Sequence, residues 1–193
     1  MKKEWRLPIS LAAITLLGHI IYFITKGNFE FLGYCTVIII LFAIIIKTDK
    51  VYNYPIASVW LISIWVVIHS LGGSVYIAGT RAFDIVLINI LGDPFFILKY
   101  DQFAHTFAFF TITIFCYYVL KKYIKKGKAL FITTVLMATG IGATYEIIEF
   151  AMVIFFDAGE AVGGYYNTVL DLVFNFTGSI LSVIFSRKVL DKK

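Results

Sequence analysis

Six long apolar runs constrain the fold of this 193-residue chain more than any other feature of its sequence. A helix needs about 20 residues to cross a hydrocarbon core of about 30 Å. The runs approach or exceed that length, and they cover residues 7–25, 29–46, 55–78, 101–120, 129–156 and 168–185. We therefore predict an all-α, polytopic membrane helix bundle with six transmembrane helices, forming one domain over residues 1–193.

The composition excludes an ordinary soluble domain. Only 15% of the residues are charged and 60% are hydrophobic, whereas soluble domains carry about 25% charge. The net charge of +5 comes from short basic clusters between the apolar runs and not from one basic surface. We therefore expect membrane lipids as partners and no nucleic acid.

The distribution of Lys and Arg predicts the orientation, because cytoplasmic loops retain an excess of them. With the N-terminus inside, only three of the 17 basic residues lie outside: Lys26, Arg81 and Lys99. We therefore predict a multi-pass protein of the cell membrane whose N- and C-termini are both cytoplasmic. The apolar run Phe83–Leu91 is too short to cross, and a crossing there would turn residues 121–128 outward. We predict that this stretch is an interfacial or re-entrant segment before the helix over 101–120.

Ionisable side chains inside the predicted spans are the candidate functional residues, because each costs several kcal/mol in hydrocarbon. Together with one asparagine they come from four helices: His69; Asp101 and His105; Glu146 and Glu149; Asp171 and Asn175. Spacings of three or four residues place each pair on one helix face. Gly142 lies on the glutamate stripe, where it allows another helix to come close, and Gly178 continues the Asp171 stripe. The predicted orientation puts all seven residues in the outer half, where they would form one polar pocket.

Structural roles compete with functional ones at several of these positions. His69 is also explained as a core histidine bonded to a carbonyl or carboxylate. Asp101 opens its helix and could cap it, and Asp171 with Thr168 resembles a capping pair. The two glutamates favour function, because two acids on one lipid-buried face repel unless they are protonated, paired or bound to a cation.

Three short motifs in these helices resemble the VanZ-like superfamily of membrane proteins, and most closely its YjdF-like branch. They are Tyr100-Asp101 followed by His105, then Tyr145-Glu146-Ile147-Ile148-Glu149, then Tyr166-Asn167-Thr168 with Asp171, Asn175 and Gly178. The resemblance spans residues 69–182. Gln102 and Asn167 depart from the pattern, where a basic residue and an acid are common. The namesake's association with low-level teicoplanin resistance implies a bacterial cell-envelope role at the outer membrane face.

Three functions are compatible with these residues. The first is binding of, or catalysis on, a lipid or lipid-linked envelope precursor, with His105 and one glutamate as base and acid, oriented by Asp101 and Asp171. A variant places a divalent cation, Mg²⁺, Mn²⁺ or Zn²⁺, among His105, Glu146, Glu149 and Asp171. The alternatives are a proton-coupled transporter and a non-catalytic structural protein. Whether the chain is an enzyme stays open at this point.

Overall fold

Six long helices build the protein, and they confirm the predicted all-α membrane bundle. The structure, a computed structural model, describes residues 2–156 and 164–190. The long helices are α1 (Arg6–Lys26), α2 (Phe29–Tyr52), α3 (Ile56–Ser74), α4 (Tyr100–Leu120), α5 (Lys128–Phe156) and α7 (Gly164–Leu190). Each of the six contains a stretch long and apolar enough to cross a membrane.

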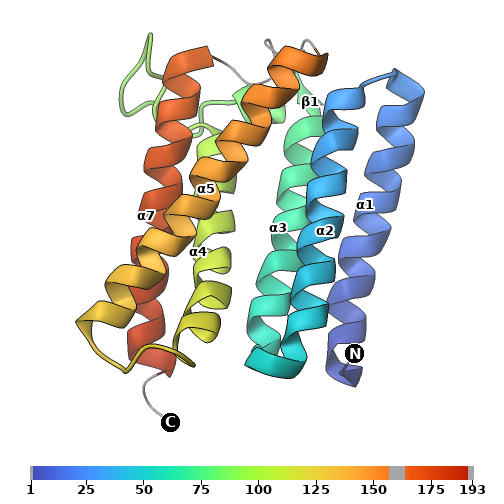
Figure 1. The fold of residues 1–193 in the computed structure, drawn as a ribbon. Helices are drawn as coiled ribbons and strands as arrows, with labels where there is room; N and C mark the ends of the chain where they lie inside the picture. The colour runs from blue at the N-terminus through green and yellow to red at the C-terminus, as the bar shows by residue number, and fades with distance from the viewer. Residues whose placement is uncertain (1, 157–163, 191–193) are drawn as a thin grey trace.

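The helices form two groups of three (Figure 1). Helix α1 packs against α2 and α3, while α4 packs against α5 and α7, and the contact between α3 and α4 joins the groups. The start of α1 and the end of α7 lie at the same end of the bundle, here called the terminal end. The opposite end carries residues 75–99 and is called the loop end. An even number of spans explains why both terminal helices share one end.

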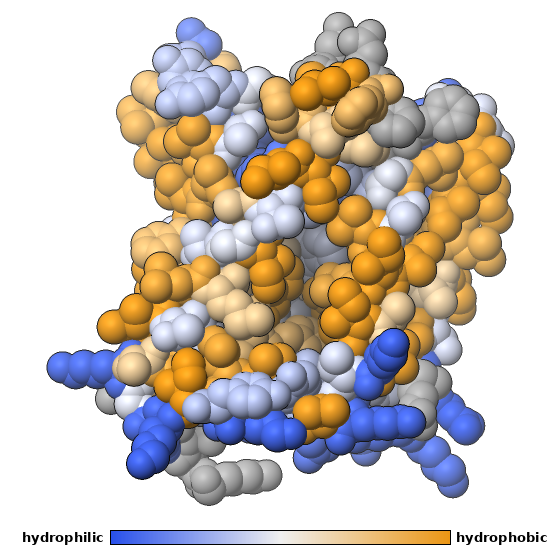
Figure 2. Space-filling model, in the orientation of Figure 1, coloured by the Kyte–Doolittle hydropathy of each residue, from blue (hydrophilic) through white to orange (hydrophobic). Residues whose placement is uncertain are grey.

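The sides of the bundle are apolar, as a lipid-facing surface requires. Figure 2 shows orange side chains along the length of the helices and blue ones gathered at the terminal end. Ile14 and Ile147, for example, are 72% and 66% exposed. These side chains would face acyl chains and not water.

The boundaries of three helices, α2, α3 and α7, differ by four residues or more from the sequence expectation, and α7 also ends later than predicted, at Leu190. Helix α2 continues six residues past 46, to Tyr52, and ends where Asn53 takes a left-handed conformation with φ of 50°. Asn is one of the few residues that adopt this conformation readily. Helix α3 ends at Ser74 and not at 78, because residues 76–81 turn back as a hairpin. Helix α7 starts at Gly164, so Thr168 and Asp171 lie inside it and do not form a capping pair.

Residues 75–99 form no α-helix and fold over the loop end. Strand β1 (Tyr76–Ile77) pairs with β2 (Thr80–Arg81) in antiparallel register, and the connecting Ala78 and Gly79 both have positive φ. This geometry is typical of a type I′ turn. The short helix η2 (Ala82–Asp84) follows and buries Phe83. Its ring fills the space beside Gly72 on α3, where a Cβ would overlap it.

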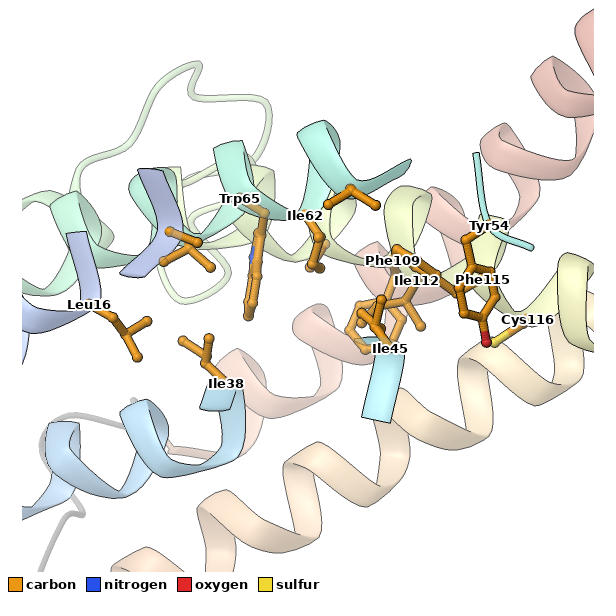
Figure 3. Close-up of a cluster of buried hydrophobic side chains, with 14 of the residues drawn as sticks. Leu16, Ile38, Ile45, Tyr54, Ile62, Trp65, Phe109, Ile112, Phe115 and Cys116 are labelled. Carbon is orange, nitrogen blue, oxygen red and sulfur yellow. The ribbon is translucent and has the colours of Figure 1, made fainter. Parts of the chain in front are cut away.

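Two apolar clusters hold the helices together, and the larger one extends to the terminal end through Trp5 and Tyr54. The larger one joins the two groups through Ile62 and Trp65 on α3 and Phe109 and Ile112 on α4 (Figure 3). The smaller one contains Phe23, Phe31, Tyr34, Phe83 and Ala104. The polar residues predicted on α3, α4 and α5 lie on helices that contribute to these clusters, and α7 packs on α4 and α5.

Candidate functional site

The first turn of α4 positions Asp101 and His105. The buried Gln102 side chain accepts hydrogen bonds from the backbone N–H groups of Leu98, at 2.5 Å, and Lys99, at 3.1 Å. Lys99 is the N-cap residue of α4, so Asp101 lies within the first turn and is not the cap. Asp101 Oδ1 lies 3.6 Å from Nε2 of His105, which follows one helical turn later. Asp101 is therefore available for the site.

Helix α7 brings Asp171 and Asn175 against α4. Both side chains are fully buried on the face that also carries Gly178 and Ser182. A Cβ at Gly178 would overlap the carbonyl oxygen of Thr106, so only glycine lets α7 approach α4 this closely. This close approach places Asp171 Oδ1 4.0 Å from His105 Nε2.

Helix α5 supplies the two glutamates of the predicted pocket. Gly142 again permits the approach, since a Cβ there would lie 3.0 Å from Asn175 Nδ2 and 3.2 Å from the Phe109 ring. Glu146 is 6% exposed, and its Oε1 lies 4.0 Å from His105 Nδ1. Glu149 is also buried, but no ion pair joins it to His105 among the described residues. Glu146 is thus the nearer of the two glutamates.

His105 is the centre of this arrangement. Its Nδ1 lies 2.9 Å from Asn175 Oδ1 and its Nε2 faces the carboxylates of Asp101 and Asp171. The Tyr145 ring covers it edge to face, with 6.1 Å between the ring centroids. We call Asp101, His105, Glu146, Asp171 and Asn175, together with Lys99 and Asn167, the histidine cluster.

Lys99 and Asn167 belong to this cluster although sequence reasoning did not select them. Asn167 Nδ2 donates to Asp101 Oδ2 at 3.2 Å and to Asp171 Oδ2 at 2.6 Å, and Lys99 Nζ donates to Asn167 Oδ1 at 3.0 Å. The signal was the four-residue spacing between Asn167 and Asp171, which places both on one helix face. The predicted helix began at 168 and left Asn167 outside it.

His69 lies apart from the histidine cluster. It is buried among Trp65, Phe83 and Tyr34, with ring centroids 5.3 to 6.0 Å away. Its Nε2 has no hydrogen-bond partner in the described part of the chain, so the structure does not show the carbonyl or carboxylate bond considered for it. His69 instead lines an apolar cavity that His105 also reaches.

The atoms best placed to share a cation differ from the set expected from sequence. One ligand atom each from Asp101, His105 and Asp171 lies within 4.8 Å of the other two. The expected set was His105, Glu146, Glu149 and Asp171. In the structure Asp101 joins His105 and Asp171, and the two glutamates are not part of this group. Two carboxylates and one imidazole form a donor set that divalent cations accept.

Arg81, the only arginine of the loop end, is held within the segment over that end. Its Nε and Nη2 donate to the two carboxylate oxygens of Asp84 at 2.9 and 3.2 Å. Burial opposes the charge, but the hydrogen bond and charge of Asp84 hold the pKa of Arg81 above its usual value. The guanidinium is therefore engaged by Asp84 within the segment.

Fold and buried polar groups together define a multi-pass α-helical membrane protein. The chain belongs to the family described as "Predicted membrane protein (DUF2238)", which matches residues 7–192. No curated protein and no solved structure matches it.

Proposed function

We propose that the protein holds a lipid or a lipid-linked envelope component at the loop end of the membrane. The observation that carries this proposal is that the histidine cluster and an apolar cavity share the His105 side chain, and the Tyr145 ring that covers His105 also lines the cavity. A ligand that fills both needs a polar head and a hydrocarbon chain. In a bilayer, lipids and lipid-linked intermediates are the molecules that combine a polar head with a hydrocarbon chain.

The cavity has a volume of about 110 Å³ and lies between the two groups of helices. Apart from its two histidines and one tyrosine its lining is apolar, and it consists of Val37, Ile38, Leu41, Trp65, His69, Ala104, His105, Ala108, Phe109, Ile112, Ile141 and Tyr145. Figure 2 shows the surface hollowed between the two groups on this face. Because Ile141 is 39% exposed, the cavity borders the lipid-facing surface and a chain could enter sideways.

Glu146 is the side chain best placed for proton transfer to or from a bound head group. Neither of its carboxylate oxygens has a hydrogen-bond partner among the described residues, and Oε1 lies 4.0 Å from His105. A group with free lone pairs beside the site can accept a proton without first breaking a bond. Glu149, one turn further along α5, is the second candidate for this role.

The resemblance of residues 69–182 to VanZ-like proteins supports a bacterial envelope role, including the link to teicoplanin. It also agrees with the charge distribution, which favours the loop end as the outer end. The motifs lie in the pocket, whereas the charge asymmetry comes from the lysines of the terminal end.

The orientation has a direct test by cysteine labelling. Cys35 and Cys116 are buried, so an introduced surface cysteine should dominate the signal. We expect a membrane-impermeant maleimide to label Asn89→Cys at the loop end of intact cells. Lys125→Cys at the terminal end should react only after permeabilisation, and the reverse pattern would contradict the outward-facing pocket.

The alternatives fit the structure less well. A transporter with alternating access needs polar sites accessible from both ends. Among the side chains whose burial the structure describes, the buried histidines and carboxylates lie in the loop-end half: His19, His69, Glu146, Glu149 and Asp171. In a purely structural network each buried polar group should have a hydrogen-bond partner, as His105 Nδ1 and Asn175 Oδ1 have in each other. Unpartnered oxygens on Glu146 and Asp171 are unfavourable in such a network.

Lipid retention tests the proposal. Native mass spectrometry would compare phosphatidylethanolamine, phosphatidylglycerol and undecaprenyl phosphate on the purified full chain. We expect the wild type to retain at least one of them about tenfold more than His105→Asn. His19→Asn is the matched control, because His19 is a buried histidine outside the cluster. Retention that is equal in the two variants for all three lipids would overturn the proposal.

A further inference from the structure

We infer that one divalent cation of the Mn²⁺ or Zn²⁺ class binds between Asp101, His105 and Asp171. The inference concerns the same pocket as the proposed function, but it rests on the ligand atoms alone and holds with or without a bound lipid.

The two aspartates each keep one oxygen directed at the imidazole. Asn167 occupies Oδ2 of both, at 3.2 Å from Asp101 and 2.6 Å from Asp171. The Oδ1 atoms remain, and they lie 3.6 and 4.0 Å from His105 Nε2. One amide therefore holds both carboxylates in the orientation that a shared cation requires.

The tautomer of His105 makes this arrangement unfavourable without a positive charge. Its Nδ1 lies 2.9 Å from the carbonyl oxygen of Asn175, and an oxygen of this kind can only accept a hydrogen bond. The imidazole therefore donates from Nδ1, and Nε2 of the neutral ring presents a lone pair. That lone pair faces two carboxylate oxygens, and a positive charge among the three atoms relieves the repulsion. A proton on Nε2 or a metal ion supplies that charge, so a metal ion that binds here displaces the proton.

Unpartnered buried oxygens beside the imidazole provide the independent observation. Asp171 is fully buried, and its Oδ1 has no hydrogen-bond partner in the described part of the chain. Neither oxygen of Glu146 has one, although that residue is only 6% exposed and points at His105. A buried polar atom without a partner costs roughly 1–3 kcal/mol, and more when it is charged. A cation at Nε2 would engage Asp171 Oδ1 directly. Glu146 lies on the Nδ1 side of the ring, outside the proposed set of ligands.

The donors indicate which cations fit. Carboxylate oxygens suit Mn²⁺ and Mg²⁺, while an imidazole nitrogen suits Zn²⁺. Ligand atoms around a tetrahedral ion with bonds near 2.1 Å are about 3.4 Å apart. The two separations from His105 Nε2 are 3.6 and 4.0 Å, and all three ligand atoms lie within 4.8 Å of one another, so the three side chains would draw together around the ion. Asn167 and Asn175 would then be the outer partners that orient the three ligands.

The cation would also change which lipids the pocket accepts. The cluster contains three carboxylates and only one lysine, so without a cation it repels phosphate. With a cation bound, a phosphate-bearing head group becomes a suitable ligand. This consequence, unlike the cation site itself, depends on the proposed function.

Manganese binding tests the inference on the full chain purified in detergent and treated with chelator. Electron paramagnetic resonance of added Mn²⁺ measures the bound fraction, and thermal unfolding with Mn²⁺, Zn²⁺ or Mg²⁺ gives a second readout. We expect one Mn²⁺ per chain and a higher melting temperature, because a ligand of the native state stabilises it. Asp101→Asn and His105→Gln should each weaken binding about tenfold or more. Asp49→Asn is the matched control, because Asp49 pairs with Lys2 at the terminal end.

The outcomes separate this inference from the proposed function. If the wild type neither binds Mn²⁺ nor melts higher with any of the three ions at millimolar concentration, the cation site is overturned, whatever the variants do. Equal binding by Asp101→Asn, His105→Gln and the wild type would also overturn it. Lipid retention measured in chelator decides the proposed function independently, so either idea can fail while the other stands.

Discussion

Replacing Gly178 with leucine should abolish stable packing of α7 on α4. Even a Cβ at this position would overlap the backbone carbonyl of Thr106, and backbone cannot rotate away as a flexible side chain can. Forcing extra atoms into a packed contact costs typically 1–3 kcal/mol, and we expect about 3 kcal/mol or more here because the obstacle is backbone. The measurement is thermal or denaturant unfolding of the purified protein in detergent.

The control for this substitution is Gly140→Leu. Gly140 also lies in a membrane-spanning helix, but no atom lies within 4 Å of where its Cβ would be, and its surface is exposed. Leucine there should leave stability unchanged or raise it, since leucine is a better helix former than glycine. If the two variants unfold at the same midpoint as the wild type, the close approach of α4 and α7 is wrong, and so is the geometry of the cluster built on it.

The fold could be predicted largely from the apolar runs, because a helix is the only single segment that satisfies its backbone in lipid. The ends of the helices were harder to predict, since they depend on local contacts that hydropathy does not report. The end of α2 depends on Asn53 and Pro55, and the end of α3 on the hairpin that starts at Tyr76. Hydropathy extended α3 through Tyr76 and Ile77, which are apolar but lie in strand β1.

The sequence indicated the depth of the candidate residues in the membrane but not the direction in which each side chain points. Intramembrane charge singled out His105 and Asp171, and the structure brings them together. The same reasoning placed His69 at the same depth in the membrane. Depth does not specify the direction in which a side chain points, and His69 points among the aromatic rings of Trp65 and Phe83. Asn167 was missed because the predicted helix began at 168 and left it outside the span, although its hydrogen bonds to Asp101 and Asp171 make it central.

Filling the apolar cavity should remove the hydrocarbon part of the ligand site while leaving the histidine cluster in place. Ala108 on α4 is 3% exposed and lines the cavity of about 110 Å³, so Ala108→Met directs a flexible side chain into it. We expect lipid retention to fall about tenfold, since a chain that loses a few methylene contacts loses at least 1.4 kcal/mol. Mn²⁺ binding should be unaffected.

The matched control fills a different cavity with the same change. Ala12 is 4% exposed and lines an apolar cavity between α1 and α2, remote from the cluster. Ala12→Met should therefore retain lipid as the wild type does. Ile141→Trp closes the first cavity from α5 and serves as a second variant where Ala108→Met folds poorly.

Photoaffinity labelling from within the bilayer tests most directly whether one ligand occupies both the cavity and the cluster. The protein would be placed in vesicles of phosphatidylethanolamine and phosphatidylglycerol that carry a diazirine in one acyl chain, and the adducts mapped by mass spectrometry. The account predicts adducts on the cavity faces of α4 and α5, around Ala104 and Tyr145, that Ala108→Met removes and Ala12→Met does not. Adducts confined to lipid-facing side chains such as Ile14 and Ile147, unchanged by Ala108→Met, would contradict it.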